Sequence, residues 1–176
     1  NIGMIFQHFN LMQSRTVLEN VLYPLAYKGI KKGDQIKKST ELLMLVDLFD
    51  RIDNYPSQLS CGQKQRLAIA WALALDPKVL LCDEAISALD PQTTYEIIEL
   101  LKNLNEKLKL TIVVITHEMD VVKDLCSSVA VMEKGKVVEQ GEIFNVFLNP
   151  KSDVTTRFMK ATSNLSKSES CCFIWC

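Results

Sequence analysis

Two stretches decide the fold of this chain: Tyr55-Pro-Ser-Gln-Leu-Ser-Cys-Gly-Gln-Lys-Gln-Arg66 and, shortly after it, Lys78-Val-Leu-Leu-Cys-Asp-Glu-Ala-Ile-Ser-Ala-Leu-Asp90. In the second stretch, the apolar run Val79–Cys82 has the length of a buried strand and ends in Asp83 and Glu84. In the first, a serine and a glutamine three residues later have the spacing of a helix capping box. The two stretches therefore predict a capped helix followed by a strand that carries two carboxylates at its end.

Helices and apolar strands alternate through the chain after residue 60. The predicted strands are Ile2–Phe6, Val79–Cys82, Thr111–Thr116, Ser128–Glu133 and Lys136–Glu139, and the predicted helices are Gly62–Leu75, Thr93–Leu108, Met119–Leu125 and Glu142–Leu148. Continuous apolar strands separated by helices favour a parallel sheet that is covered on both faces.

The segment between the first two strands has a different character, because its apolar spacing is helical. Thr16 and Glu19 form a second capping box, which predicts a helix start. A further helix is predicted after Gly33, with Asp34 as its cap, and a short third one covers Leu48–Ile52. Residues 14–58 are therefore predicted to be a small all-helical insertion.

Composition limits the classes of function. The 176 residues are enough for one sizeable core, and 48% of them are hydrophobic. The net charge of -1 gives no basic face for nucleic acid, which we therefore exclude as a partner. The six cysteines do not have the arrangement of a disulfide framework, which favours a reducing cytoplasm. The Ser- and Lys-rich residues 159–176 are predicted to be a disordered tail.

Polar residues follow three of the predicted strands, and they are Gln7, Asp83, Glu84 and His117. Ligand crevices of open α/β sheets lie at the carboxyl ends of the strands. Nucleotide hydrolysis needs one carboxylate to hold Mg²⁺ and another to orient the attacking water. Asp83 suits the first role and Glu84 the second, while His117 could donate a hydrogen bond to a terminal phosphate.

The helix that begins after Ser60 offers a second candidate site, because free amides at a helix N-terminus attract anions. Each feature alone also has a structural explanation: a well-capped helix, solvated carboxylates at a strand end, or a structural histidine. Together they occur in one order at close spacings, which coincidence does not easily produce. The combination favours a nucleotide-hydrolysing machine.

This order of motifs resembles the nucleotide-binding subunit of ABC transporters over residues 1–158. The resemblance implies a P-loop NTPase-like (RecA-like) α/β fold with a mostly parallel sheet, an all-helical subdomain at about residues 14–58, and a missing amino-terminal part. It implies catalytic roles for Glu84 and His117, and Mg²⁺ coordination by Asp83 and Gln7. It also implies nucleotide contacts by Gln7, Ser60, Gly62, Gln63, Asp83 and Asp90.

The resemblance further implies ATP and Mg²⁺ as cofactors, a second copy of the subunit as dimer partner, and a membrane permease that works with a substrate-binding protein. The chain would lie on the cytoplasmic face of the membrane, attached through the permease. Within the family, it looks most like the ATPase subunits of methionine importers. Ala85 supports this, because many relatives, among them importers of polar amino acids, have proline there.

Departures from the family pattern leave a second interpretation open. The phosphate-binding loop Gly-x-x-x-x-Gly-Lys-Ser/Thr is missing, and so is the strand that carries it; the only Gly-Lys pair is Gly135-Lys136. Cys61, Trp71 and Ile86 replace a glycine, an arginine and a threonine of the family pattern. The chain is thus either a partial importer ATPase, of methionine or of a polar amino acid, or an inactive truncated cassette. An ABC ATPase of DNA repair or translation is disfavoured, because the segment between Gln7 and Ser60 is too short for the insertions of those proteins.

Overall fold

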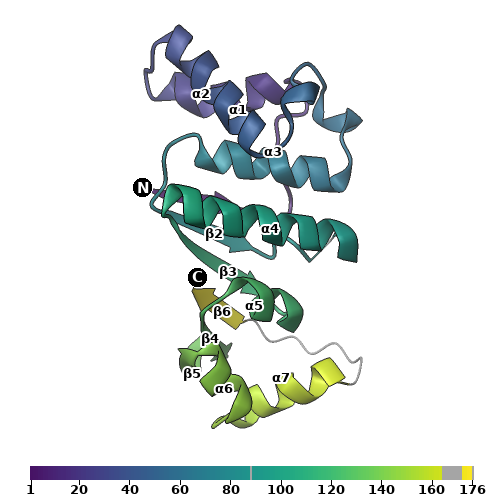
Figure 1. Ribbon diagram of the computed structural model, residues 1–176, viewed down its shortest axis with the longest axis vertical. Coiled ribbons are helices and arrows are strands. Elements are labelled where there is room, and N and C mark those ends of the chain that lie inside the picture. The colour runs from purple at the N-terminus through teal and green to yellow at the C-terminus, as the bar shows by residue number, and fades with distance from the viewer. Residues whose placement is uncertain (88, 164–171, 176) are drawn as a thin grey trace.

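The computed structural model describes residues 1–87, 89–163 and 172–175, and it shows a central sheet with helices packed against it (Figure 1). The strands are β1 (Ile2–Ile5), β2 (Val79–Asp83), β3 (Thr111–Thr116), β4 (Ser128–Glu133), β5 (Lys136–Glu142) and β6 (Cys172–Trp175). The α-helices are α1 (Val17–Tyr27), α2 (Lys32–Leu45), α3 (Cys61–Leu73), α4 (Pro91–Leu108), α5 (Met119–Leu125), α6 (Ile143–Leu148) and α7 (Asp153–Ser163). Two 3₁₀ turns, Phe49–Arg51 and Pro56–Gln58, lie between α2 and α3.

The sheet has the strand order β1-β2-β3-β6-β4-β5. β1, β2 and β3 pair in parallel, whereas β6 pairs antiparallel with both β3 and β4, and β5 pairs antiparallel with β4. β4 therefore runs in the same direction as β1, β2 and β3. The prediction of a sheet whose main strands are parallel is confirmed for these four, and β6 is an addition that the sequence did not predict.

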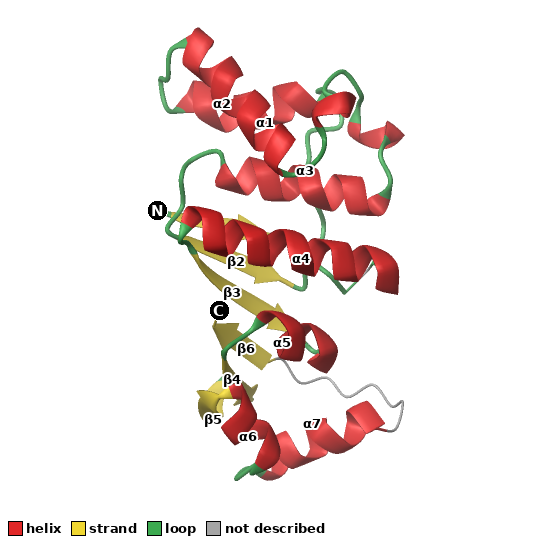
Figure 2. Cartoon of the chain, in the orientation of Figure 1, coloured by secondary structure: helices red, strands yellow, loops and turns green. Residues whose placement is uncertain are grey.

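Helices between the first two strands form a layer of their own. In Figure 2, α1 and α2 lie beyond α3, which separates them from the strands. Residues 14–58 contain helices, turns and loops and no strand. None of the helices in the described part of the chain is long and apolar enough to cross a membrane.

The sequence predicts cap residues for three helices, and the observed starts of α1, α2 and α3 can be compared with them. Thr16 caps α1 and Ser60 caps α3, each with a complete capping box, so both predictions are confirmed. The predicted cap Asp34 is wrong, because α2 already begins at Lys32 and Lys31 has the extended backbone of the cap position. Asp34 instead lies in the first turn, where its negative charge faces the positive end of the helix dipole.

The carboxyl-terminal part differs from the predicted disordered tail. Helix α7 continues to Ser163, and residues 172–175 form β6; residues 164–171 lie outside the described part of the chain. The helix is stabilised because Val154 and Phe158 bury their side chains, which the Ser- and Lys-rich composition of the neighbouring residues concealed.

Among the residues whose side chains are described, the buried apolar residues form two clusters. The large core joins α1 to α4 with the first three strands, and its strand residues include Ile5, Leu80, Cys82, Ile112 and Val114. The small core joins β4, α5, α6 and α7, and its members are Met119, Val122, Cys126, Val129, Val131, Ile143, Val146, Val154 and Phe158. Helix α5 contributes to both, with Val121 in the large core and Met119 and Val122 in the small one.

Asn20 is fully buried in α1 and holds the loop that follows β1. Its Nδ2 donates to the carbonyl oxygens of Met12, Arg15 and Thr16 at 3.2, 3.1 and 2.8 Å. Its Oδ1 accepts a hydrogen bond from the Met12 amide at 2.9 Å. The side chain thus satisfies backbone groups of a loop that has no regular structure of its own, and it fixes the path of the chain between β1 and α1.

We expect Asn20→Ala to lower the free energy of unfolding by about 2 kcal/mol, because it leaves several loop groups without partners. Urea denaturation followed by circular dichroism measures the loss. Asn103→Ala is the matched control. Asn103 is exposed on α4, and its side chain donates a hydrogen bond to the Glu99 carbonyl of the same helix. Equal midpoints for the two variants would contradict this role of Asn20.

Candidate active site

The carboxyl ends of β1, β2 and β3 meet at one edge of the sheet, because the three strands are parallel and in close register. Ile5 pairs with Cys82, and Asp83 pairs with Ile115. Glu84 and His117 follow directly on β2 and β3, and Gln7 follows β1 after Phe6. Figure 1 shows the arrows of β2 and β3 directed to the same side of the molecule. The structure therefore places all four predicted strand-end residues at one edge.

Glu84 and His117 are in contact at this edge. The His117 Nδ1 atom lies 3.3 Å from Glu84 Oε1, and the two side chains are 48% and 27% exposed. A carboxylate that is open to solvent can accept a proton from a water molecule or orient it, and the adjacent imidazole can donate a hydrogen bond to an anion. The pair is chemically suited to direct a water molecule at a phosphate group.

The backbone of Glu84 is held in an unusual conformation. Its φ of 46° lies in the left-handed region, which L-residues other than glycine seldom adopt. The Glu84 amide donates to the Ile115 carbonyl at 2.9 Å, and the Ser87 hydroxyl donates to the Glu84 carbonyl at 2.9 Å. The first bond ties the turn after β2 to the neighbouring strand β3, and the second lies within the turn, so both restrain the backbone that carries the carboxylate. Unusual backbone angles of this kind gather at functional sites.

Asp83 and Gln7 are the other two predicted strand-end residues, and both carry side-chain oxygens. Asp83 is half-buried at the end of β2, and Gln7 is exposed. The described residues contain no group of three His, Cys, Asp or Glu side chains that could hold a metal ion by themselves. Mg²⁺ usually binds through one or two carboxylates together with waters and substrate phosphates. The donors therefore fit a Mg²⁺ ion that arrives with a nucleotide, and they do not form a resident metal cage.

The N-terminus of α3 holds Ser60, Gly62 and Gln63, which the family resemblance implies as nucleotide contacts. Ser60 Oγ accepts from the Gln63 amide at 3.3 Å, and Gln63 Oε1 accepts from the Ser60 amide at 3.0 Å. The side chain of Gln63 is thus engaged in capping its own helix. No hydrogen bond or ion pair described for this part of the chain joins these residues to Glu84 or His117.

Gly62 packs against the start of α4, a contact that the sequence did not reveal. A Cβ atom added at Gly62 would lie 2.5 Å from Thr93 Cγ2, far inside van der Waals contact. Thr93 is itself fixed, because its amide donates to Asp90 Oδ1 at 3.1 Å and its hydroxyl donates to Asp90 Oδ2. The absent side chain of Gly62 therefore lets the starts of α3 and α4 approach closely. Asp90, predicted as a nucleotide contact, is the cap of α4.

The three departures from the family pattern have different surroundings. Ile86 is buried in the large core, so an apolar side chain is well accommodated there. Cys61 is exposed at the start of α3. Trp71 is 36% exposed on the same helix. None of the three displaces the Glu84–His117 pair.

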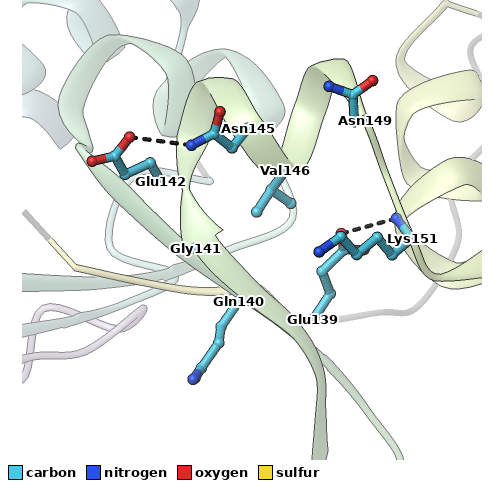
Figure 3. A pocket seen from close by; sticks show the side chains of 8 residues that line it. All are labelled: Glu139, Gln140, Gly141, Glu142, Asn145, Val146, Asn149 and Lys151. Carbon is cyan, nitrogen blue, oxygen red and sulfur yellow. Dashed lines mark hydrogen bonds between the residues drawn. The ribbon is translucent and has the colours of Figure 1, made fainter.

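A cavity of about 260 Å³ lies between β5, α6 and the segment before α7 (Figure 3). Its most connected charged group is Glu139, whose oxygens accept from the Lys151 and Ser152 amides at 2.9 and 3.0 Å and from the Thr155 hydroxyl at 2.6 Å. Burial raises the pKa of Glu139, but these hydrogen bonds outweigh it and lower the pKa below its usual value. The Glu139 carboxylate thus stabilises the start of α7 through these hydrogen bonds. We therefore assign the cavity a structural role and not a ligand-binding one.

Known proteins with similar sequences are consistent with a nucleotide-hydrolysing site at this edge of the sheet. A family model described as ABC transporter matches residues 1–87. Methionine import ATP-binding protein MetN of Bacillus subtilis is 60% identical over 159 residues, which are 90% of this chain and 47% of that protein. The protein of the same name from Aliivibrio fischeri is 57% identical over 169 residues, 96% of this chain and 49% of that protein. Over most of its length, this chain is therefore similar to ATP-binding proteins of the ABC transporter family.

A solved structure supports the fold. It is a dimeric post-hydrolysis state of the ATP-binding cassette MJ0796 bound to ADP and Pi, with a TM-score of 0.70 and 37% sequence identity, covering 81% of this chain and 63% of that one. The P-loop NTPase-like α/β fold is therefore confirmed. The chain spans about half the length of the curated relatives described above.

We expect Gly62→Ala to destabilise the fold by about 1–3 kcal/mol, the usual cost of overpacking. The added methyl group meets Thr93 Cγ2, which a β-branched side chain cannot easily move away. Thr93→Ser removes that methyl and keeps the hydroxyl that bonds to Asp90. Urea midpoints of both single variants and the double variant test the contact: Thr93→Ser should recover most of the loss in Gly62→Ala. Additive effects would exclude the proposed clash.

The capping carboxylate of α4, Asp90, should make the stability of the folded state depend on pH. Hydrogen bonds from the side chain and the amide of Thr93 lower the pKa of Asp90 below its usual value of 3.8. The ionised carboxylate therefore stabilises the folded state above the unfolded-state pKa, and this contribution is lost as pH falls through the lower folded-state value.

Asp90→Asn keeps a capping oxygen and removes the charge. We expect the stability advantage of the wild type over Asp90→Asn to be present at about pH 7 and to shrink only below about pH 4. Urea unfolding of both proteins across this range measures it. An advantage that is unchanged far below that pH would show that the charge of Asp90 is not its source.

Proposed function

We propose that this chain is part of the ATP-hydrolysing subunit of an ABC importer for an amino acid, with methionine as the transported substrate. The observation that carries the proposal is the Glu84–His117 contact at the carboxyl edge of the parallel strands, next to Asp83. The methionine assignment is supported by the names of the relatives, MetN in Bacillus subtilis and Aliivibrio fischeri.

In this proposal, Glu84 orients the attacking water and accepts its proton, while His117 donates a hydrogen bond towards the terminal phosphate. Asp83 and Gln7 would supply oxygen ligands to a Mg²⁺ ion that arrives with the nucleotide, and its charge would offset that of the phosphate oxygens. The left-handed backbone of Glu84 and its bond to Ile115 hold the carboxylate in place during these steps.

The residues at the carboxyl edge of the sheet suit the terminal phosphate and its Mg²⁺ ion, but they do not include a glycine-rich loop for the β- and γ-phosphates. The only Gly-Lys pair, Gly135-Lys136, lies at the turn between β4 and β5, with Gly135 at a φ of 75°. Amides of a glycine-rich loop at the carboxyl edge, together with its lysine, are what hold the β- and γ-phosphates in nucleotide-hydrolysing proteins of this type. β6 enters the sheet at this edge and runs away from it, since Cys172 pairs with Thr116 and Trp175 with Val113.

We propose that a second copy of the subunit completes the site. Ser60 and Cys61 are exposed at the start of α3, so the free amides of this helix are accessible to an anion on another molecule. The solved relative described above is dimeric. Exposed apolar side chains on the helical layer, Tyr23, Tyr27, Met44 and Phe49, suit a contact with a membrane permease. That contact would hold the subunit at the cytoplasmic face of the membrane.

An inactive cassette is the alternative that a specific observation favours, namely that β6 runs antiparallel to its neighbours β3 and β4. An importer of polar amino acids is a weaker alternative, because Ala85 stands where those subunits have proline; the residue is buried in the large core. The two alternatives differ in whether a completed version of the chain hydrolyses ATP at all.

The test is to complete the chain with the segment that precedes the matched region in the Bacillus subtilis relative. We expect this chimera to bind Mg²⁺–ATP and hydrolyse it, and we expect Glu84→Gln in the chimera to slow hydrolysis at least about 100-fold while binding persists, because the water-activating carboxylate is lost. Phosphate release and binding of a fluorescent ATP analogue measure the two quantities.

Glu118→Gln is the matched control, because Glu118 follows His117 without being part of the predicted site, and it should hydrolyse ATP at the normal rate. The unmodified chain should show no saturable binding below millimolar nucleotide. A well-folded chimera that binds ATP and does not hydrolyse it would favour the inactive cassette.

A further inference from the structure

The turn that follows β3 presents His117 to solvent between two buried residues. Thr116, the last residue of β3, is 3% exposed, and Met119, the first residue of α5, is 2% exposed. The side chain of His117, by contrast, is 48% exposed. β3 leads through this turn into α5 (Figure 1). The turn is therefore anchored in the interior at both ends, and the imidazole lies outside it.

The end of β3 carries a hydroxyl group, although the strand before it is apolar. Residues 112–114 are buried aliphatic residues, and the buried hydroxyl of Thr116 needs a hydrogen-bond partner. Its Oγ1 accepts from the Glu118 amide at 3.0 Å. Threonine hydroxyls can bond to the backbone two residues further on and so close a turn. Here the closed turn contains the whole backbone of His117.

A helix cap is the usual structural role of such a hydroxyl, and the position of Thr116 does not fit it. A capping side chain accepts from the second or third amide of the helix. The cap residue of α5 is Glu118, whose side chain makes no capping hydrogen bond. Thr116 lies two residues before this cap and accepts from the amide of the cap residue itself. Its hydrogen bond therefore restrains the turn around His117 rather than the first turn of α5.

Glu84 is tied to the same strand. The Glu84 amide donates to the carbonyl oxygen of Ile115, the residue directly before Thr116, at 2.9 Å. The His117 Nδ1 atom lies 3.3 Å from Glu84 Oε1. Because the backbone of Glu84 is bonded to β3, this distance depends on how the chain turns after Thr116. If the turn opened there, the imidazole would move away from a carboxylate whose backbone stays in place.

We propose that Thr116 is a positioning residue for His117. Its buried hydroxyl holds the Glu118 amide, and the closed turn keeps the imidazole against the Glu84 carboxylate. The role of this contact in hydrolysis rests on the proposed function, but the contact itself can be measured without nucleotide. The proposal can therefore succeed or fail separately from ATP hydrolysis by the completed chain.

The test measures the contact in the full chain by NMR of the histidine rings. The chain has two histidines, and His8→Gln assigns the ring signals of His117 by elimination. Glu84→Gln removes the carboxylate charge beside the imidazole, so we expect it to shift the His117 signals when Thr116 is present. In Thr116→Val, which offers no acceptor to the Glu118 amide, the same change at Glu84 should produce less than half of this shift.

Thr116→Ser is the matched control, because it keeps the hydroxyl and removes only the methyl group. The shift caused by Glu84→Gln should persist in it. Thr116→Ala is a second variant without the hydroxyl, and it decides the question if Thr116→Val does not fold. Circular dichroism identifies the variants that keep the fold, so that a general loss of structure is not mistaken for loss of the contact.

Three results would overturn the proposal. If Glu84→Gln does not shift the His117 signals when Thr116 is present, the contact does not exist in solution. If the full shift persists in a folded Thr116→Val or Thr116→Ala variant, the hydroxyl does not position His117. If the shift is also lost in Thr116→Ser, the methyl group, and not the hydroxyl, holds the turn.

Discussion

Parallel pairing of β1, β2 and β3 is the constraint on which the rest of the structure depends. It brings the ends of three strands that are far apart in the sequence to one edge, and every predicted strand-end residue lies there. The contact between Glu84 and His117 follows from this register, because the turn after β2 is bonded to the backbone of β3 at Ile115. Side-chain chemistry at the edge is thus a consequence of main-chain hydrogen bonding.

A second constraint acts through small contacts at helix starts. Asp90 fixes Thr93, and the Thr93 methyl group fills the space above Gly62, so the starts of α3 and α4 are held against each other. Ser60 and Gln63 close the capping box on the same helix. Residues that resemble nucleotide contacts therefore also have structural roles. A change in nucleotide handling on mutation of Gly62 or Asp90 would combine a direct effect with a shift of the two helices, and the stability measurements separate these contributions.

The carboxyl-terminal half shows how a sheet can be completed by an unrelated piece of chain. β4 and β5 form a hairpin with their own small core, and β6 supplies the pairing that connects it to the larger half. The family resemblance predicted a missing strand, and the structure shows an antiparallel strand between β3 and β4, two strands that would otherwise have unpaired edges. A reversed strand pairs with both neighbours at this position, and its first residue, Cys172, lies at the edge that holds Glu84.

The sequence by itself determined the helices and strands with regular apolar spacing, such as Thr111–Thr116 and Met119–Leu125, and the capping boxes at Thr16 and Ser60. These depend on near neighbours in the chain, as does the motif order that indicated the family. Tertiary structure alone decided the buried network of Asn20, the contact of Gly62 with Thr93, and the insertion of β6 between β3 and β4. Each of these joins groups whose meeting depends on packing in three dimensions, and local spacing carries no information about it.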